Sequence, residues 1–499
     1  MVFSSYVFIL IFLPAAWLGF EIARRRISAR AAFGWLVIAS FIYFGYWNPV
    51  YLPLLFFSIL FNFYVGAGIA SEKREKPSKP LLIFGIVVNL VLLAWFKYAN
   101  FFSDTVEALT GFEMLMVQVV LPIGISFFTF QQVAYLVDAY RGLAKEYDFL
   151  EYALFVTFFP QLIAGPIVHH SEMIPQFLDR ARDRRAFTDL SIGMTIFAIG
   201  LGKKVILADQ FALWANPVFN MADAGVTPSM SEAWIGTLAY TLQLYFDFSG
   251  YSDMAIGIAR MFGIVLPLNF FSPYKSTSIV DFWRRWHITL SRFLRDYLYI
   301  PLGGNRKGPA RRYVNLITTM LLGGLWHGAG WTFVVWGLLH GIYLMINHAW
   351  ADLCKRLGIL QKWQGPSRRA IAIGLTFLAA AAAWIPFRAM TFSGAGNIYE
   401  GLVTIGHEPL AALPMMECIP WILAGLLIVF FAPNSMQIMA RTKPALEYLT
   451  APDKWPARET SLVNLKWRPT IIWSLLTTIL FTVAFVLIGR GSEFIYFQF

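Results

Sequence analysis

The sequence predicts an all-α, polytopic integral membrane protein. Of its 499 residues, 58% are hydrophobic and 14% are charged, whereas soluble domains contain roughly 45–50% apolar and about 25% charged residues. Apolar stretches without a charged residue recur along the whole length, as expected for a chain that crosses a bilayer many times. We expect roughly ten to twelve transmembrane helices, together with re-entrant or amphipathic helices.

The apolar stretches follow one another at short intervals from the N-terminus onward. They cover residues 7–20, 31–46, 51–70, 81–96, 119–137, 152–164, 190–201, 233–246, 314–325, 331–346, 370–387, 419–431 and 471–488. A full span needs about 20 residues. The shorter stretches, such as 152–164, are therefore expected to re-enter the membrane or to be buried inside the protein.

Basic residues predict the orientation of the chain. Arg24, Arg25, Arg26 and Arg30 follow the first apolar stretch, whereas a secretory signal peptide carries its positive charge before the apolar run. We therefore expect a retained first helix with the N-terminus outside and its basic end in the cytosol. The basic loop at 72–79 fits the same rule, and the loop at 180–185 fits it if the stretch 152–164 re-enters without crossing. Positive-inside loops then explain most of the net charge of +11. Nucleic-acid binding is disfavoured, because the basic residues alternate with spans instead of forming one stripe.

The chain is expected to form one membrane domain over residues 1–499. Its informative core covers about 120–350, and a polar loop at about 441–468 separates the last spans. Cys354 and Cys418 predict neither a disulfide framework nor a metal site. No glycine-rich phosphate loop follows a strand, and Gly303 and Gly304 are expected to make a tight turn.

Two acidic residues stand in an apolar helical pattern at the start of the informative region. On a straight helix, Asp247 and Asp253 would be about 240° apart. Gly250 could unwind the helix locally and bring both carboxylates towards one cavity. The favoured interpretation is structural: the acids pair with arginines that follow, because buried charges need partners.

The segment 281–296 combines arginines with a histidine. Read as one helix, its polar stripe holds Arg284, His287, Ser291 and Arg295 at i, i+3, i+7 and i+11. Asp281 with Arg285, and Arg292 with Asp296, are expected i, i+4 ion pairs. An interfacial amphipathic helix would explain the arginines. An anionic ligand accounts better for His287, since arginine binds phosphate in a two-pronged geometry.

Two histidines follow in apolar surroundings, in the sequences Trp326-His327-Gly328 and Leu339-His340-Gly341. An ionisable side chain in hydrocarbon is costly, and histidine suits proton transfer near neutral pH. Thirteen residues separate the two, which is about 220° on an unbroken helix. A joint site would require the glycines at 328 and 330 to break the helix. We therefore expect His340 to be structural, and residue chemistry alone leaves His327 equally open to a structural and a catalytic role.

Several long segments resemble the membrane-bound O-acyltransferases, and within them the branch that includes the membrane subunit of bacterial alginate O-acetyltransferase. The segments are LPIGISFFTFQQVAYLVDAYRG from Leu121, FFPQLIAGPI from Phe158, QLYFDFSGYSDMAIG from Gln243, DFWRRWHITLSRFLRDYLYIPLGGNR from Asp281 and LLGGLWHG from Leu321. The opening MVFSS and the stretch FKYAN from Phe96 are also similar. Beyond about residue 350, only WIPFRA around Pro386 is familiar.

The resemblance implies a helical bundle around a central tunnel, with an acyl donor entering from the cytosol. The family's invariant histidine corresponds to His327, which would act as the general base, and its second catalytic position, usually Asn or His, corresponds to His287. His287 would orient the donor or stabilise the developing oxyanion. Supporting or donor-binding positions are Arg284, Arg285, Ser291, Arg295, Asp247, Asp253 and Trp326.

The expected function is therefore that of a subunit in the inner membrane of a bacterium that passes acetyl groups outward for O-acetylation of a cell-surface polysaccharide. Alginate is the first choice, and peptidoglycan, cellulose and other exopolysaccharides are alternatives. The donor would be acetyl-CoA or another acetyl thioester, with no tightly bound cofactor and no metal. An extracytoplasmic acetyltransferase partner would complete the reaction. The rival class is a proton-coupled transporter or flippase that uses His327, Asp247 and Asp253 as a relay; a non-catalytic scaffold is disfavoured because both histidine motifs are intact.

Overall fold

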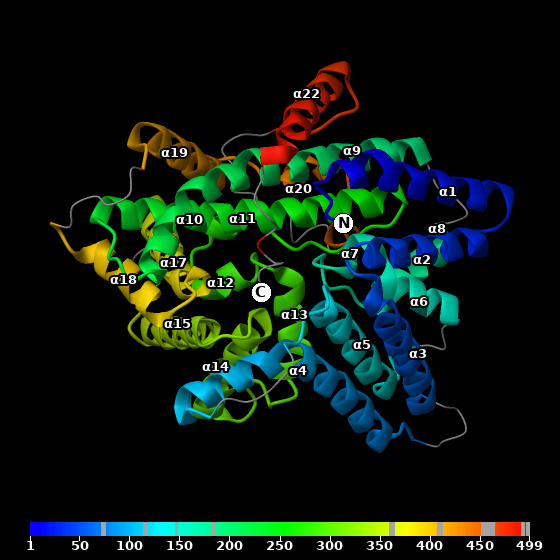
Figure 1. Cartoon of the computed structure of the whole chain (residues 1–499), viewed down its shortest axis with the longest axis horizontal. Helices are drawn as coiled ribbons and strands as arrows, with labels where there is room; N and C mark the ends of the chain where they lie inside the picture. Colours follow the sequence, from blue (N-terminus) through cyan, green and yellow to red (C-terminus); the bar gives the residue numbers. More distant parts are fainter. Residues whose placement is uncertain are drawn as a thin grey trace. The chain divides into compact units, whose positions relative to one another are not determined.

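The computed structural model describes residues 1–70, 76–112, 118–144, 148–180, 186–358, 365–406, 413–450, 465–490 and Ile495. All regular structure in these residues is helical (Figure 1), which confirms the predicted all-α class. Three predicted features lie partly outside the described residues. These are the basic loops at 72–79 and 180–185 and the polar loop at 441–468, of which residues 451–464 are not described.

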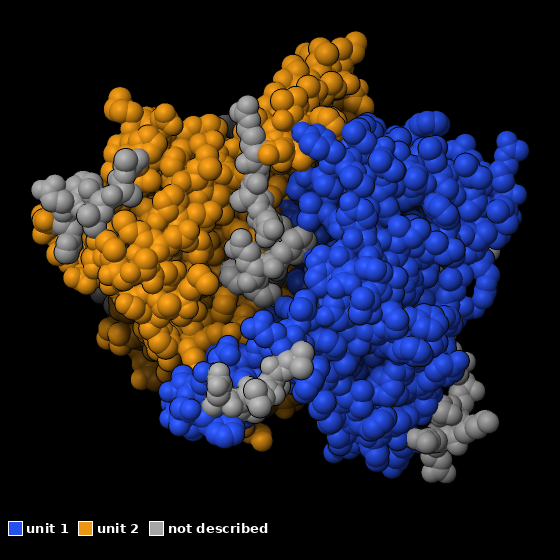
Figure 2. Space-filling model, in the orientation of Figure 1, with its two compact units in different colours: residues 1–197, 251–267, 444–446 blue, residues 198–250, 268–443, 447–499 orange. Residues whose placement is uncertain are grey.

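The described residues group into two compact units (Figure 2), each built from separate stretches of chain. Unit 1 contains residues 1–197, 251–267 and 444–446, and unit 2 contains 198–250, 268–443 and 447–499. The division falls inside two helices, α9 (Ala186–Gly202) and α11 (Met230–Met261). The single domain expected from the sequence stays a prediction.

Unit 1 is built mainly from the N-terminal helices. These are η1 (Phe8–Phe12), α1 (Leu13–Arg26), α2 (Ala29–Gly45), η2 (Pro49–Tyr51), α3 (Leu52–Ile69), α4 (Lys79–Thr110), α5 (Ile125–Tyr140), α6 (Phe149–Thr157), α7 (Phe159–Leu162) and α8 (His170–Arg180). Helix α1 packs on α2, and α5 packs on both α3 and α4. The apolar stretch 152–164 forms α6 and α7 and is buried throughout, in agreement with the expectation that so short a stretch lies inside the protein.

Two buried amides join consecutive helices of unit 1. The side-chain amide of Asn62 in α3 donates to Oδ1 of Asn89 in α4 at 3.1 Å, and Asn89 returns a 2.7 Å hydrogen bond to Asn62. Each amide also donates to the backbone carbonyl one turn earlier, of Ser58 and Gly85 respectively. Both side chains therefore satisfy their donors within an otherwise apolar helix pair.

Unit 2 contains the later helices. They are η3 (Lys203–Ala208), α10 (Asp209–Asp223), η4 (Pro273–Lys275), α12 (Ile279–Trp283), α13 (Ile288–Leu294), η5 (Arg295–Tyr299), α14 (Gly308–His327), α15 (Trp331–Arg356), α17 (Pro366–Arg388), α18 (Phe392–Val403), α19 (Met415–Phe431), α20 (Ser435–Ile438), η6 (Ala440–Thr442), α21 (Glu447–Thr450), α22 (Ile471–Leu487) and η8 (Ile488–Arg490). As predicted, Gly303 and Gly304 form a turn in which both have positive φ, 113° and 56°, values that favour glycine.

Among the described residues, five helical segments are long and apolar enough to cross a membrane. They are Pro49–Ile69, Lys79–Thr110, Ala186–Asp223, Trp331–Arg356 and Pro366–Arg388. Three shorter apolar helices, Ala29–Gly45, Met415–Phe431 and Ile471–Leu487, accompany them. The chain therefore has the helices of a membrane protein, while ten to twelve spans and a central tunnel stay predictions.

Helix α14 packs closely against α15 (Figure 1), and glycines on both helices allow this close approach. A Cβ atom on Gly324 of α14 would collide with the backbone carbonyl of Phe333 in α15. One on Gly337 of α15 would in turn collide with the carbonyl of Met320. Small residues let helix backbones approach in this way when lipid offers no hydrophobic driving force. The turn at 328–330 therefore joins two helices whose backbones are in close contact.

The Gly324→Ala variant should therefore unfold more readily than the wild type. The added methyl group has no room and should cost about 1–3 kcal/mol, read as a lower thermal unfolding midpoint of the detergent-solubilised protein. Gly374→Ala is the matched control, because a Cβ at this position in α17 meets nothing within 4 Å. Equal midpoints for the two variants would contradict the close-packing argument.

Candidate active site

The break at Gly328–Gly330 brings two histidines of the α14–α15 hairpin onto one aromatic side chain. His327 is the last residue of α14, and α15 begins at Trp331. The ring of Trp336 lies 4.9 Å from that of His327 and 4.9 Å from that of His340, centroid to centroid. The helix break that a joint site would require is therefore present.

His327 lies in an aromatic enclosure. Its side chain is buried, and besides Trp336 its ring is 5.0 Å from Trp326 and 5.3 Å from Phe387. As the C-terminal residue of a 20-residue helix, it faces the negative end of the helix dipole, which favours a positively charged imidazolium. This position suits a group that must accept a proton during a reaction.

His287 lies beside His327, with 6.3 Å between ring centroids, and Trp326 is 6.3 Å from His287. Three predicted site residues are thus together. The predicted single helix over 281–296 is wrong, however: α12 ends at Trp283 and α13 begins at Ile288. His287 occupies the junction in a left-handed conformation, φ 42° and ψ 55°, so Arg284, His287, Ser291 and Arg295 do not form one continuous stripe.

Asn269 fixes the orientation of the His287 ring. Oδ1 of Asn269 accepts hydrogen bonds from the Thr289 hydroxyl, at 2.9 Å, and from the Thr289 backbone N–H, at 3.4 Å. Nδ1 of His287 lies 3.0 Å from the same oxygen. Because a carboxamide oxygen can only accept, Nδ1 is the protonated nitrogen of His287 and Nε2 carries the lone pair.

Burial keeps this ring neutral. The side chain of His287 is fully buried, and burial lowers its pKa to about 3. With this tautomer, Nε2 accepts hydrogen bonds and cannot donate one to an oxyanion. Of the two expected roles, the geometry therefore favours orienting a donor or an acceptor group that carries a proton.

The other predicted site residues of segment 281–296 differ in their ion pairs and in their exposure to solvent. The Asp281–Arg285 pair is confirmed at 3.0 Å. Asp296 accepts hydrogen bonds from Arg295 at 2.7 and 2.9 Å. Arg284 and Arg295 are exposed, whereas Ser291 is partly buried and its hydroxyl reaches the Trp286 carbonyl at 3.4 Å. Arg284 and Arg295 are thus the arginines of this segment that can meet a ligand from solution.

Asp247 belongs to a buried charge cluster in unit 2, not to the histidine pair. Lys204 lies 2.8 Å from Asp247 and 2.6 Å from Asp209, and the backbone N–H of Ile495 donates to Asp247 at 3.0 Å. The expectation of a structural ion pair is confirmed for Asp247, although the partner is a lysine that precedes it rather than an arginine that follows. The proposed unwinding at Gly250 is wrong, since α11 is continuous and a Cβ at Gly250 would instead crowd the Gly200 carbonyl. Asp253 is buried in unit 1.

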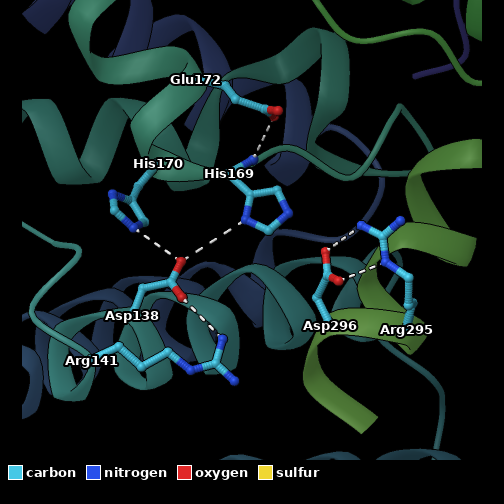
Figure 3. A network of polar contacts seen from close by, with 7 residues as sticks. All are labelled: Asp138, Arg141, His169, His170, Glu172, Arg295 and Asp296. Carbon is cyan, nitrogen blue, oxygen red and sulfur yellow. Dashed lines mark hydrogen bonds and ion pairs between the residues drawn. The ribbon is translucent and has the colours of Figure 1, made fainter. Parts of the chain in front are cut away.

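Unit 1 contains a polar cluster that the sequence reasoning missed (Figure 3). Asp138 in α5 lies 3.2 Å from Nε2 of His170, 3.9 Å from Nδ1 of His169 and 3.8 Å from Arg141. Glu172 accepts from the His169 backbone N–H at 3.2 Å. Asp138 lies within one of the segments that carried the family resemblance, and the two histidines come shortly after another. The cluster ties the end of α5 to the start of α8.

Asn269, Trp336, Trp384 and Phe387 are the other site residues that sequence reasoning missed. Asn269 is a lone amide in the apolar run that follows α11, and a buried amide of this kind was the available signal. Trp384 stacks on Trp336 at 5.9 Å and 18°. Trp384 and Phe387 come from WIPFRA, the one familiar segment of the C-terminal third.

The fold and the site define a class: a helical membrane protein with a buried, paired-histidine centre suited to proton transfer. The sequence profile of the membrane-bound O-acyltransferase family matches residues 81–380. The chain belongs to this family and is an acyltransferase.

Named relatives agree with this assignment. The chain is 42% identical to the peptidoglycan O-acetyltransferase of Helicobacter pylori over 83% of this chain and 82% of that protein. It is 37% identical to the probable alginate O-acetylase of Pseudomonas putida over 100% of both chains. The teichoic acid D-alanyltransferase of Streptococcus thermophilus is 30% identical over 46% of this chain and 57% of that protein.

Replacing Lys204 by Met should destabilise the protein by about 3–5 kcal/mol, because it leaves two buried carboxylates without their shared cation. The measurement is the thermal unfolding midpoint in detergent. Lys203→Met provides the control: its Nζ donates to the Ser435 hydroxyl at 3.1 Å, and losing one such bond costs only about 1 kcal/mol. A Lys204 variant as stable as the Lys203 variant would argue against the charge cluster.

His287→Asn should retain more acyl-transfer activity than His287→Ala, because asparagine still offers a polar group at this position. The pH–rate profile of His287→Asn should match the wild type between pH 5.5 and 8. With its pKa lowered to about 3, His287 stays neutral in that range and gains a proton only as the pH falls towards about 3. A limb of the profile that disappears in His287→Asn would show that His287 titrates near neutrality and would contradict this assignment.

Proposed function

We propose that the protein is an O-acetyltransferase subunit of the bacterial inner membrane that moves acetyl groups outward for O-acetylation of a cell-surface polysaccharide. The observation that carries the proposal is the buried pair of His327 and His287, 6.3 Å apart, in a chain of the O-acyltransferase family. The family match favours acyl transfer over the rival transporter, and the pairing of Asp247 with Lys204 gives this carboxylate a structural role.

In the proposed reaction, His327 is the general base. It removes a proton from an acceptor hydroxyl, which then attacks the thioester carbonyl of the donor. The end of α14 stabilises the imidazolium so formed, and a positioned base contributes roughly 10²–10⁴-fold to the rate. His287, with its lone pair on Nε2, orients the hydroxyl or donor group.

The donor in this proposal is acetyl-CoA or another acetyl thioester, and no tightly bound cofactor takes part. Arg284 is exposed, as are Arg306 and Lys307 in the loop that leads into α14 and Arg311 at the start of α14. Arg295 is exposed as well, with two hydrogen bonds to Asp296. Guanidinium groups bind phosphates in a two-pronged geometry, so these side chains suit the phosphates of coenzyme A or of a phosphopantetheine arm. Arg285 is less suited, because it is buried and paired with Asp281.

Alginate is the favoured polymer and peptidoglycan is the alternative. Similarity to the probable alginate O-acetylase of Pseudomonas putida over 100% of both chains supports the first, and 42% identity to the peptidoglycan O-acetyltransferase of Helicobacter pylori supports the second. In either case an extracytoplasmic acetyltransferase partner would receive the acetyl group, and the N-terminus would lie outside, as the arginines that follow the first apolar stretch predict.

The His327→Ala variant should lower polymer acetylation by about 10²–10⁴-fold, since the base is lost. The measurement is the initial rate of acetyl-ester formation in the exopolysaccharide and, separately, in the peptidoglycan of the producing cells, at matched amounts of membrane protein. The polymer whose esters disappear identifies the pathway.

The matched control is His348→Ala, which removes a partly buried histidine of α15 outside the proposed site and should leave acetylation unchanged. If both polymers of the His327→Ala strain keep their acetyl esters at normal protein levels, the catalytic role of His327 is refuted.

A further inference from the structure

His340 shares the aromatic surroundings of His327. It is fully buried in α15, one helical turn after Trp336. The Trp336 ring is 4.9 Å from each of the two histidine rings. Whatever reacts at His327 therefore does so one side chain away from His340.

A tryptophan determines which nitrogen of His340 carries the proton. Nε1 of Trp283 lies 3.2 Å from Nδ1 of His340. An indole N–H can only donate, so Nδ1 is the acceptor. The neutral ring therefore carries its proton on Nε2, which is the opposite tautomer to that of His287.

The Nε2–H group of His340 and a neighbouring indole N–H group have no hydrogen-bond acceptor among the described residues. Nε2 of His340 and Nε1 of Trp336 are both shielded from solvent, and neither has a hydrogen-bond partner among the residues that the structure describes. Buried N–H donors in proteins are nearly always paired. Two such donors on consecutive turns of one helix, next to the proposed base, point to an acceptor oxygen that belongs to a ligand.

Acyl transfer needs such donors. The carbonyl oxygen of the acyl group gains negative charge when the carbonyl carbon is attacked, and preorganised N–H groups in a dry site stabilise it. His287 cannot supply one, because its N–H is engaged by Asn269 and its other nitrogen is an acceptor.

We propose that Nε2–H of His340 and Nε1–H of Trp336 donate hydrogen bonds to the carbonyl oxygen of the transferred acyl group. This role rests on the acyl transfer proposed above and makes His340 and Trp336 catalytic residues of that reaction.

The reaction would proceed in two steps. His327 takes the proton of the acceptor hydroxyl as its oxygen forms a bond to the thioester carbon, and the carbonyl π pair moves onto the oxygen held by the two N–H groups. The pair then returns, the carbon–sulfur bond breaks, and the thiolate leaves with the proton from His327. The products are an ester and a thiol.

Three variants test the two donors. His340→Leu removes the donor without adding a polar atom, Trp336→Phe keeps an aromatic ring and removes the N–H, and His340→Gln keeps an N–H close to the position of Nε2. The readout is the initial rate of acetyl-ester formation in the polymer of the producing cells, per amount of folded membrane protein. We expect His340→Leu and Trp336→Phe to lower this rate by about 10²–10³-fold each, with partial recovery in His340→Gln.

Trp214→Phe is the matched control for lost volume, because Trp214 is also a buried tryptophan of unit 2; its rate should stay at the wild-type value. If His340→Leu and Trp336→Phe keep near wild-type rates while His327→Ala is inactive, the role of the two N–H donors is refuted and the general-base role of His327 is not. The two N–H groups would then donate to a buried water molecule instead of the acyl oxygen. A loss in His340→Leu that His340→Gln does not relieve and Trp336→Phe does not share would also overturn it. Wild-type rates in His327→Ala would instead refute the acyl-transfer mechanism itself.

Discussion

The close approach of α14 and α15 is the constraint on which the candidate site depends. Gly324 and Gly337 remove the side chains that would hold the two backbones apart. The short turn at 328–330 then places the end of α14 against Trp336 of α15. A wider helix pair would separate His327 from the aromatic side chain that it shares with His340. The candidate site therefore depends on the two glycines, which have no side chain to separate α14 from α15.

At this helix pair, two neutral histidines are held in opposite tautomers, because the atom that faces Nδ1 of each ring can only accept or only donate a hydrogen bond. Asn269 offers His287 an oxygen, so the ring must donate from Nδ1. Trp283 offers His340 an N–H, so the ring must accept at Nδ1. The same side chain thereby presents a lone pair on Nε2 at one position and an N–H on Nε2 at the other. A site that moves protons and develops negative charge needs both kinds of atom.

The sequence was sufficient for the all-α class and for two histidines of the candidate site. Long charge-free apolar stretches are typical of transmembrane helices, and the motifs around His287 and His327 singled out two histidines whose ring centroids lie 6.3 Å apart in the structure. The helix break at His287 was not predictable, because its left-handed conformation depends on Asn269 and on backbone hydrogen bonds to the segment after α11. The partner of Asp247 was also predicted wrongly, because Lys204 belongs to an element earlier in the chain. Helical periodicity in the sequence identifies only neighbours on the same helix. Whether the chain encloses a tunnel is likewise a property of packing that no periodicity reveals.

The paired amides of Asn62 and Asn89 have a consequence for how the protein is made. In lipid, a carboxamide without its partner would be a costly exposed dipole on either helix. The two helices that carry the amides, α3 and α4, are consecutive in the chain, so the partner of each amide is synthesised next to it. If the two helices enter the bilayer together as a hairpin, the two amides can already be hydrogen-bonded to each other. Sliding or rotating one helix against the other would break both interhelical hydrogen bonds at once. The pair therefore favours a single register between α3 and α4, and it does so without any contact from helices later in the chain.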